Sequence, residues 1–551
     1  MQEEDGAQGG RLAEAERAVD LAARVAGQAA AALAALSDGG KRLDDCQVFA
    51  YDVAHATAGV ETARAAISYG RHGGTETALA AVFAADVVSD IVLRTVGREE
   101  TWGLRSGWHG ELGAFLARER SAAALAALAE TPGPDHLVED FELVRDSFRR
   151  FAAEQIAPRA EGIHRENADV PEAIISGLAD MGGFGLSVPE EYGGAASGGE
   201  HDYLGMVVAT EELSRASLGA GGALITRPEI LSRAIVKGGT AAQRERLLPR
   251  IASGEVMVAV AVTEPDFGSD VANLAVTASR VHNGYLVNGV KTWCTFAARS
   301  EVLMLLARTD PDRSKGHRGL SLFVVEKPRT ASEGFVLEQP PGESGRPEDA
   351  AAGRLEGRPI DTLGYRGMHS YELAFENWFV PEENLIGGEE GKGRGFYLQM
   401  QGFENGRLQT AARAIGVMQA AYDAALDYAR GRAVFGRPII EYELTRAKLG
   451  RMAAMTQASR QMAYKVAALM AAGEGSMEAS MVKAYVCRAA EWVSREAMQI
   501  HGGMGYAEEF PVSRLFVDAR VLSIFEGADE TLCLKVIARR LAEQAQSLRT
   551  G

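Results

Sequence analysis

The chain has 551 residues, which is too long for one hydrophobic core and predicts roughly three domains. Its formal charge of -17 argues against nucleic acid or an anionic membrane as a partner, because either would select a basic surface. Its four cysteines, Cys46, Cys294, Cys487 and Cys533, lie far apart and form no C-x-x-C pair. We therefore expect neither a disulfide framework nor a structural zinc site, and no other metal site.

The N-terminal sequence MQEEDGAQGG is acidic and lacks the basic start and apolar core of a secretory signal. No uninterrupted apolar run approaches the ~18 residues that a membrane span needs. These features predict a cytoplasmic protein with no membrane partner.

Residues 1–137 are predicted to form an N-terminal helical extension. Helical spacing covers residues 11–36, 46–70 and 75–96, and the sequence TPGPDHL at residues 131–137 is typical of a linker. His55 lies on a helix among small residues, which favours a packing or surface histidine over a ligand. The last helix of the extension faintly resembles a helix near the C-terminus, so we hypothesise that it occupies a surface that contacts a second dimer in shorter relatives.

The rest of the chain predicts an α+β fold in three further domains. Residues 138–255 are helical, with a loop from Gly182 to Gly194. Residues 256–388 change to a period of two and predict a β domain of seven or eight strands. Within them, residues 338–361 are rich in Gly, Pro and Glu and predict an exposed, mobile loop. Residues 389–551 predict four long helices in an antiparallel bundle.

The stretch DARVLSIFEGADETL, residues 518–532, places one acid, Glu526, between large apolar side chains and a small Gly527 at the predicted start of a helix. Burial disfavours the charged form of such an acid, while the N–H groups of a first helical turn favour it. A carboxylate balanced between these effects suits a general base that removes a proton from carbon. An acidic residue in an ordinary first helical turn would look the same, so this motif needs support from elsewhere.

A second group of residues predicts a site for a planar heterocycle. The sequence AVTEPDFGSD, residues 261–270, ends a strand and turns at Pro265 to Gly268, which brings Thr263 and Ser269 close together. Trp293 and Thr295 are predicted two apart on another strand and hence on one face. An indole can contact the face of a heterocycle while a hydroxyl binds its edge.

Five motifs in this order, T-E-P-x-x-G-S-D, W-x-T, R-x-x-F-G, Q-x-x-G-G-x-G and F-E-G, resemble those of the acyl-CoA dehydrogenase family. The resemblance covers about residues 138–545. It implies a helical domain, a β-barrel-like middle domain and a four-helix bundle, to which this chain adds its N-terminal extension. It also implies FAD as cofactor and a homodimer as the smallest competent unit, because the cofactor is shared between subunits.

The resemblance assigns residues to FAD in two groups. The group at the isoalloxazine is Val262, Thr263, Ser269, Trp293 and Thr295. The group that would hold the pyrophosphate and adenosine part from the neighbouring subunit is Arg432, Phe435, Gln499, Gly502 and Gly503. The chain departs from the family pattern at Val434, Ala528 and Glu530, where polar contacts to FAD are common.

Glu526 matches the catalytic base of the family, since the alternative position for the base is here occupied by Gly406. The resemblance implies that Glu404 and Arg407 bind CoA, with help from Ser269. Phe525 and Gly527 flank the base in the substrate pocket, where Gly527 leaves room beside it. Proton removal by Glu526 and hydride loss from the β-carbon would give a trans enoyl-CoA, with electrons passing to an electron-transfer flavoprotein.

Within the family, the extension, the 338–361 insertion and the sequences around residues 364–373 and 523–532 resemble members that act on short branched dicarboxylic acyl-CoA esters. This implies (2S)-methylsuccinyl-CoA as substrate and mesaconyl-CoA as product, in the ethylmalonyl-CoA pathway. A buried substrate carboxylate needs cationic or hydrogen-bonding partners, and the candidates are Arg227, Arg366, His369 and Tyr371. Each is equally compatible with an ordinary ion pair at a surface or between domains.

Three other functions stay open at this point. One is a dehydrogenase for another short-chain ester, such as glutaryl-CoA or isobutyryl-CoA. Another is an oxidase that passes electrons to O₂. The third is a flavin-binding scaffold without catalysis, against which the intact Glu526 and Gly527 argue.

Overall fold

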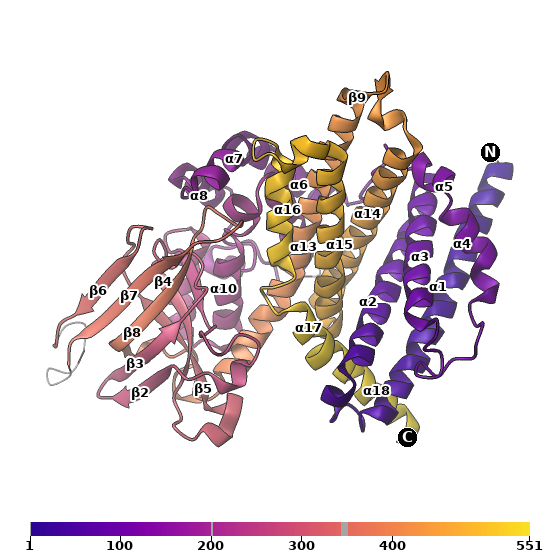
Figure 1. The fold of residues 1–551 in the computed structure, drawn as a ribbon. Coiled ribbons are helices and arrows are strands. Elements are labelled where there is room, and N and C mark those ends of the chain that lie inside the picture. Colours follow the sequence, from indigo (N-terminus) through magenta and orange to yellow (C-terminus); the bar gives the residue numbers. More distant parts are fainter. Residues whose placement is uncertain (1, 200–201, 343–345, 347–350, 551) are drawn as a thin grey trace. The chain divides into compact units, whose positions relative to one another are not determined.

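The computed structural model describes residues 2–199, 202–342, 346 and 351–550. The chain divides into two compact units, of which the first comprises Met1–Arg145 and Thr410–Gly551 and the second Asp146–Gln409. The helices and strands of both are shown in Figure 1.

The first unit begins with three long helices of the N-terminal extension, as the sequence predicts. They are α1 (Gln2–Leu36), α2 (Gln47–Gly70) and α3 (Gly74–Thr95), followed by the short helices α4 (Gly113–Glu119) and α5 (Ala122–Ala127). Alanine is the most frequent buried residue of α2 and α3, and its small side chain lets these helices pack closely against each other and against α1.

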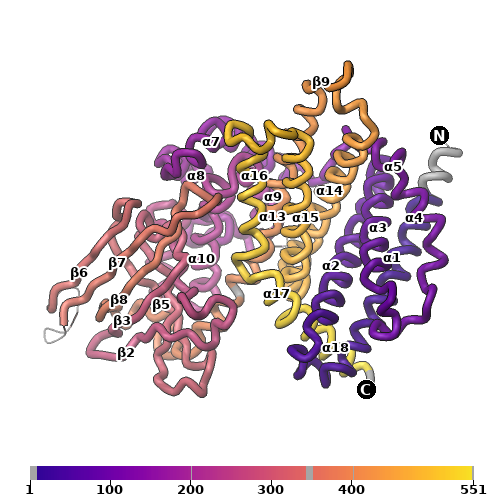
Figure 2. Tube along the Cα trace, in the orientation of Figure 1, coloured from indigo at the N-terminus to yellow at the C-terminus, as the bar shows by residue number. Residues whose placement is uncertain are grey.

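The C-terminal part of the chain completes the first unit. Its elements are the part of α13 (Gly395–Gly431) from Thr410 onward, α14 (Glu443–Ala471), α15 (Ser476–His501), α16 (Pro511–Leu522), α17 (Asp529–Thr531), η12 (Leu532–Ala538) and α18 (Arg539–Thr550). Helices α2 and α3 pack on α14, α2 also packs on α15 and η12, and α1 packs on α18. Figure 2 shows these long helices side by side. The extension and the bundle therefore share one continuous helical core.

Residues Gly9–Leu36 of α1 are long and apolar enough to cross a membrane by length and composition, and 44% of the most apolar window is buried within the structure. Two charged residues, Asp20 and Arg24, interrupt this window, so the helix contains no unbroken apolar run of that length. The buried positions Ala15, Val19, Ala22 and Val25 recur at helical spacing and form the face that packs on α2 and α3.

The second unit contains the helices that precede the sheet. They are α6 (Glu139–Phe151), which begins in the first unit, and α7 (Ala157–Glu166), α8 (Glu172–Asp180), α9 (Asp202–Ala216), α10 (Thr226–Gly238) and α11 (Ala241–Ala252). The hydroxyl of Thr240 accepts from the Gln243 backbone N–H and the Gln243 side chain accepts in return, a capping box that fixes the start of α11.

Eight strands follow and form one curled, mixed sheet. They are β1 (Val258–Ala261), β2 (Thr277–Val281), β3 (Gly284–Lys291), β4 (Val302–Arg308), β5 (Leu320–Glu326), β6 (Phe335–Gln339), β7 (Gly353–Ile360) and β8 (Ser370–Pro381). The order is β1-β4-β2-β3-β8-β7-β6, with β5 paired to β4. Every residue of β4 is buried, so this strand has apolar side chains on both of its faces. The α+β fold predicted from the sequence is confirmed.

The predicted loop at residues 338–361 is wrong at both ends. Strand β6 extends to Gln339 and β7 occupies Gly353–Ile360, and the two pair antiparallel from Phe335↔Gly357 to Gln339↔Gly353. The Gly and Glu content of β7 is typical of a loop, but buried and half-buried residues alternate over its first five positions, as in a strand. Residues 343–345 and 347–350 of the predicted loop lie outside the described residues.

The shared core of the first unit makes a prediction about stability. Phe83 of α3 is 1% exposed and its ring meets that of Tyr485 on α15 edge-on, with 6.0 Å between centroids. We expect Phe83→Ala to lower the free energy of unfolding by about 3–5 kcal/mol, because it leaves a cavity between extension and bundle. Leu93→Ala on the same helix is the control, since Leu93 is 74% exposed. Urea unfolding followed by circular dichroism measures both, and equal effects would contradict the shared core.

Candidate active site

Glu526 lies on a sharp turn between α16 and α17 rather than in the first turn of a helix, which corrects the sequence-based expectation. Its φ is +55° and that of Gly527 is +95°, so both residues have the left-handed backbone that is costly for any residue but glycine. Lys483 Nζ donates to the Gly527 carbonyl over 2.6 Å, and the Asp529 N–H donates to the Ser523 carbonyl over 3.1 Å. These bonds hold the strained turn in one conformation.

The Glu526 carboxylate faces a buried cation. Its side chain is 11% exposed, and Oε1 lies 3.8 Å from Nη2 of Arg413, which is fully buried on α13. The guanidinium of Arg413 also lies over the Phe525 ring at 4.7 Å from its centroid. Arg413 thereby contacts both Glu526 and its apolar neighbour, and the sequence alone gave no reason to single it out.

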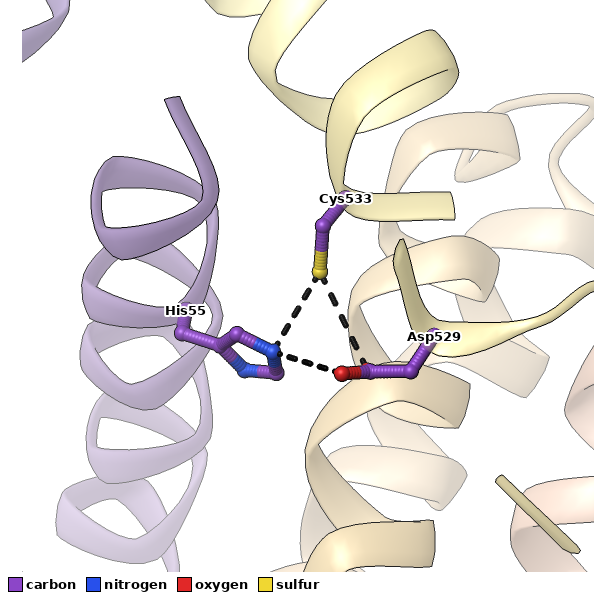
Figure 3. Close-up of side chains that lie close together, drawn as sticks. All are labelled: His55, Asp529 and Cys533. Carbon is purple, nitrogen blue, oxygen red and sulfur yellow. Dashed lines mark hydrogen bonds and ion pairs between the residues drawn. The ribbon is translucent and has the colours of Figure 1, made fainter. Parts of the chain in front are cut away.

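Three residues after Glu526, Asp529 is held by the N-terminal extension. The hydroxyl of Tyr51 donates to its Oδ2, and Nε2 of His55 lies 3.1 Å from the same oxygen. Cys533 Sγ lies 3.4 Å from His55 Nε2 and 3.9 Å from Asp529 Oδ1 (Figure 3). His55 is thus a buried, hydrogen-bonded residue rather than a surface histidine. This arrangement ties helix α2 to the segment that directly follows the Glu526 turn.

In the second unit, Trp293 and Thr295 lie on a turn after β3 and not on a strand, so the predicted common strand face is wrong. Trp293 has a φ of +58° and Phe296 a φ of +69°. The Cys294 N–H donates to the Tyr371 carbonyl over 3.0 Å, and the Phe296 N–H donates to the His369 carbonyl over 2.8 Å. The turn leaves Trp293 55% exposed, whereas Thr295 is buried with its hydroxyl 3.0 Å from that of Ser370.

A buried ion pair anchors Thr263 beside this turn. Lys291, fully buried at the end of β3, donates to the Glu264 carboxylate and to the Val262 carbonyl, each over 2.8 Å. Burial lowers the pKa of Lys291 to about 8, against the opposing effect of Glu264. Thr263 is half-buried and accepts at its carbonyl from the Thr292 N–H over 2.8 Å, while Ser269 is exposed on the predicted turn. The T-E-P and W-x-T motifs are therefore structural neighbours.

The residues assigned to the pyrophosphate and adenosine part of FAD are all exposed in the first unit. Arg432 and Phe435 lie on the β9–β10 hairpin (Ala433–Val434 and Arg437–Pro438), with Phe435 98% exposed. Gln499 lies near the end of α15, and Gly502 and Gly503 lie in η11 (Gly502–Tyr506). Such exposure suits groups that bind a ligand from a second chain, and it is unusual for a phenyl ring otherwise.

The four candidates for a substrate carboxylate differ in their partners. His369 Nε2 already pairs with Asp169 over 3.2 Å, and the Tyr371 hydroxyl donates to the Ser332 carbonyl over 2.8 Å. Asp169 and Ser332 line an open hollow of ≈ 500 Å³. Arg366 donates to the backbone carbonyls of His164 and Thr362.

Arg227 is the buried cation of the four. It is 6% exposed and donates to the Ala223 carbonyl over 3.0 Å and to the Tyr365 hydroxyl over 2.9 Å. Within the part of the chain that the structure describes, no carboxylate pairs with it. Tyr365 lies in the loop that leads into β8, and residues 368–371 of this segment form backbone hydrogen bonds with the Trp293 turn. Arg227 is thus linked to that turn through Tyr365.

The residues predicted to bind CoA lie on α13. Glu404 is half-buried and Arg407 is 8% exposed. The neighbouring Asn405 and Gln409 donate to the buried carboxylate of Glu229 on α10, a network that sequence reasoning missed because no local pattern links the two helices.

Comparisons with known proteins agree with this arrangement. The N-terminal, middle and C-terminal domain patterns of acyl-CoA dehydrogenase match residues 138–255, 259–378 and 393–542. The chain belongs to the acyl-CoA dehydrogenase family. It is therefore an oxidoreductase that acts on CH–CH bonds of acyl-CoA substrates, in a family whose general cofactor is FAD.

Individual relatives refine this picture. The chain is 44% identical to the (2S)-methylsuccinyl-CoA dehydrogenase of Cereibacter sphaeroides over 415 residues, which are 75% of this chain and 71% of the relative. A glutaryl-CoA dehydrogenase bound to glutaryl-CoA is 30% identical with a TM-score of 0.65, covering 74% of this chain and 96% of that one. A chain from a structure titled as the electron transferring flavoprotein of Acidaminococcus fermentans is 29% identical with a TM-score of 0.65, covering 76% and 100%.

The contacts of Asp529 make a prediction about pH. Burial alone would raise the pKa of the Asp529 carboxyl, but the hydrogen bonds from His55 and Tyr51 outweigh burial, so this pKa is lowered. The pKa of the His55 imidazole is also lowered, because the effect of its burial exceeds the opposing effect of Asp529. At acidic pH the unfolded chain therefore binds protons that the folded chain does not, and stability falls. We expect the urea midpoint to drop from about pH 6.5 downward as the unfolded histidine titrates, and again near pH 4 as the unfolded aspartate does.

Two variants separate this effect from general acid sensitivity. His55→Gln should weaken the upper part of the pH dependence, and a remainder should stay because burial also lowers the pKa of His501. His282→Gln, at an exposed position in the β2–β3 turn, should leave the profile unchanged. A pH profile of His55→Gln that matches the wild-type profile would show that His55 is not responsible.

Proposed function

We propose that the protein oxidises (2S)-methylsuccinyl-CoA to mesaconyl-CoA, uses FAD and passes the electrons to an electron-transfer flavoprotein. The identity of 44% to a relative with this substrate supports the choice of ester. The observation that carries the chemistry is Glu526, a nearly buried carboxylate held on a strained turn beside the cation of Arg413. The proposal includes a homodimer in the cytoplasm, as the sequence predicts.

The residues present fit FAD. An exposed indole at Trp293, fixed by backbone bonds on either side, offers a flat apolar surface for a ring. Thr263 and Ser269 would bind polar ring edges, and Val262 and Thr295 would line the same part of the site. Arg432, Phe435, Gln499, Gly502 and Gly503 would hold the remainder of the cofactor of a neighbouring chain. When bound, FAD supplies an acceptor for the hydride from the substrate β-carbon.

The protein groups supply the acid–base chemistry. Glu526 accepts the α-proton of the thioester at a carboxylate oxygen, while its own backbone N–H donates to the thioester carbonyl on which negative charge develops. Arg413 orients the carboxylate from behind, since its guanidinium contacts both Glu526 and Phe525. Glycine suits position 527, because a side chain there would be strained at a φ of +95° and its Cβ would lie 2.9 Å from Leu532. Glu404, Arg407 and Ser269 would bind the CoA part.

Arg227 is our candidate for the distal carboxylate. A buried arginine with neutral partners can accept a carboxylate as a charge-assisted, bidentate ligand. His369 is less suited because Asp169 already supplies a negative charge at its ring. The Tyr371 hydroxyl already donates a hydrogen bond to the Ser332 carbonyl.

The catalytic assignment is tested by Glu526→Gln, which keeps size and hydrogen bonding but cannot accept the proton. Anaerobic addition of methylsuccinyl-CoA should bleach the wild-type flavin rapidly and leave the variant yellow, with a rate at least ~10³-fold lower. The variant should still bind the ester, as a perturbed flavin spectrum without bleaching. Rapid bleaching in the variant would reject Glu526 as the base.

The substrate assignment is tested with two esters and two variants. Arg227→Gln should raise KM for methylsuccinyl-CoA roughly 10–100-fold and leave KM for isobutyryl-CoA, which has no distal carboxylate, nearly unchanged. Arg227→Lys keeps the charge and should lie between. Equal losses on both esters would mean that Arg227 is structural. Wild-type bleaching by glutaryl-CoA or isobutyryl-CoA but not by methylsuccinyl-CoA would reject the ester itself.

A further inference from the structure

Three potential metal ligands converge in the core of the first unit, outside the residues of the proposed reaction. They are His55 from α2 and Asp529 and Cys533 from the C-terminal segment, at 4%, 6% and 0% exposure. Figure 3 shows the imidazole, the carboxylate and the thiol pointing toward one another from separate elements. A buried carboxylate is costly in an apolar core unless polar groups surround it, which favours a specific role for this cluster.

The distances suit coordination of one ion. Bond lengths of ~2.0–2.3 Å in a tetrahedral zinc site place neighbouring ligand atoms about 3.3–3.8 Å apart. The observed separations are 3.1 Å between nitrogen and oxygen, 3.4 Å between nitrogen and sulfur and 3.9 Å between sulfur and oxygen. Small side-chain shifts would place all three groups around a common centre, with the fourth position left to water.

The geometry is not that of a Cys-His-Asp catalytic triad. In a triad the acid binds one ring nitrogen and the nucleophile the other. Here Cys533 and Asp529 face the same nitrogen, Nε2 of His55, which can carry only one proton. Hydrogen bonds from the His55 Nε2–H and the Cys533 thiol to the two oxygens of Asp529 are one arrangement of the cluster, and a metal ion bound by all three groups is the other.

We propose that His55, Asp529 and Cys533 bind a divalent ion of the Zn²⁺ class, which fastens the N-terminal extension to the segment after Glu526. Nitrogen, oxygen and sulfur donors together match the borderline softness of Zn²⁺. The tyrosine hydroxyl of Tyr51 on Asp529 is the outer partner that ligating carboxylates usually have.

Charge and proton balance support the ligand set. The ion binds a carboxylate, a neutral imidazole and a thiolate, so the complex has no net charge, and one thiol proton leaves to solvent. One proton is therefore released for each ion bound.

The test uses the full-length, FAD-loaded and tag-free protein, treated with a chelator and titrated with Zn²⁺ by calorimetry and elemental analysis. We expect one Zn²⁺ per chain, a raised melting temperature, and at least hundredfold weaker binding in Cys533→Ser and His55→Gln. Cys46→Ser removes a thiol elsewhere in the same unit and should bind as the wild type does. X-ray absorption of the wild-type Zn²⁺ complex should show one sulfur neighbour at about 2.3 Å.

The outcomes are decisive even if a variant fails to fold, because absorption by the wild-type complex identifies the ligands directly. A bound ion without a sulfur neighbour would overturn the proposal. So would a wild-type affinity no higher than that of Cys533→Ser, which would identify the cluster as hydrogen-bonded only. Neither readout depends on dehydrogenase activity.

Discussion

The first unit depends on the hydrogen bonds to the buried carboxylate of Asp529. This carboxylate accepts them from Tyr51 and His55 of the N-terminal extension, and it lies in the segment that begins directly after the strained Glu526 turn. A buried charge must be matched by such donors, or its desolvation would oppose folding. The extension thus contacts the segment that follows Glu526 instead of forming a separate appendage, and α2 and α3 pack in the same core as α14 and α15.

Backbone strain occurs at the proposed functional segments. Glu526, Trp293, Phe296, Tyr365 and His369 all have positive φ although none is glycine, and elsewhere among the described residues the same holds for Asp38, His136, Asn167, Asn283, Asn377 and Phe435. Such conformations persist only where surrounding bonds fix them. At the Glu526 turn, Lys483 donates such a bond to the Gly527 carbonyl. At the Trp293 turn, backbone hydrogen bonds join residues 294–296 to residues 368–371. A fixed local backbone at each of these two segments suits residues that must hold their side chains in one position.

Much of this organisation was readable from the sequence. Helical spacing located α1, α2 and α3, and the change to a period of two located the sheet, because burial on one face sets both patterns. The motif order identified the family. Strand β7 was missed because its glycines and glutamates resemble a loop. Trp293 and Thr295 were misplaced because alternation cannot reveal a turn at positive φ. His55, Asp529 and Arg413 could not be connected from the sequence, since their partners are up to 478 residues away and follow no local period.

The central claim is that Glu526 removes the α-proton of the substrate. Solvent deuterium entering the α-carbon of methylsuccinyl-CoA, measured by mass spectrometry under anaerobic conditions without an electron acceptor, tests it most directly. The account predicts exchange catalysed by the wild-type protein and none above background with Glu526→Gln. Undiminished exchange in that variant would contradict it.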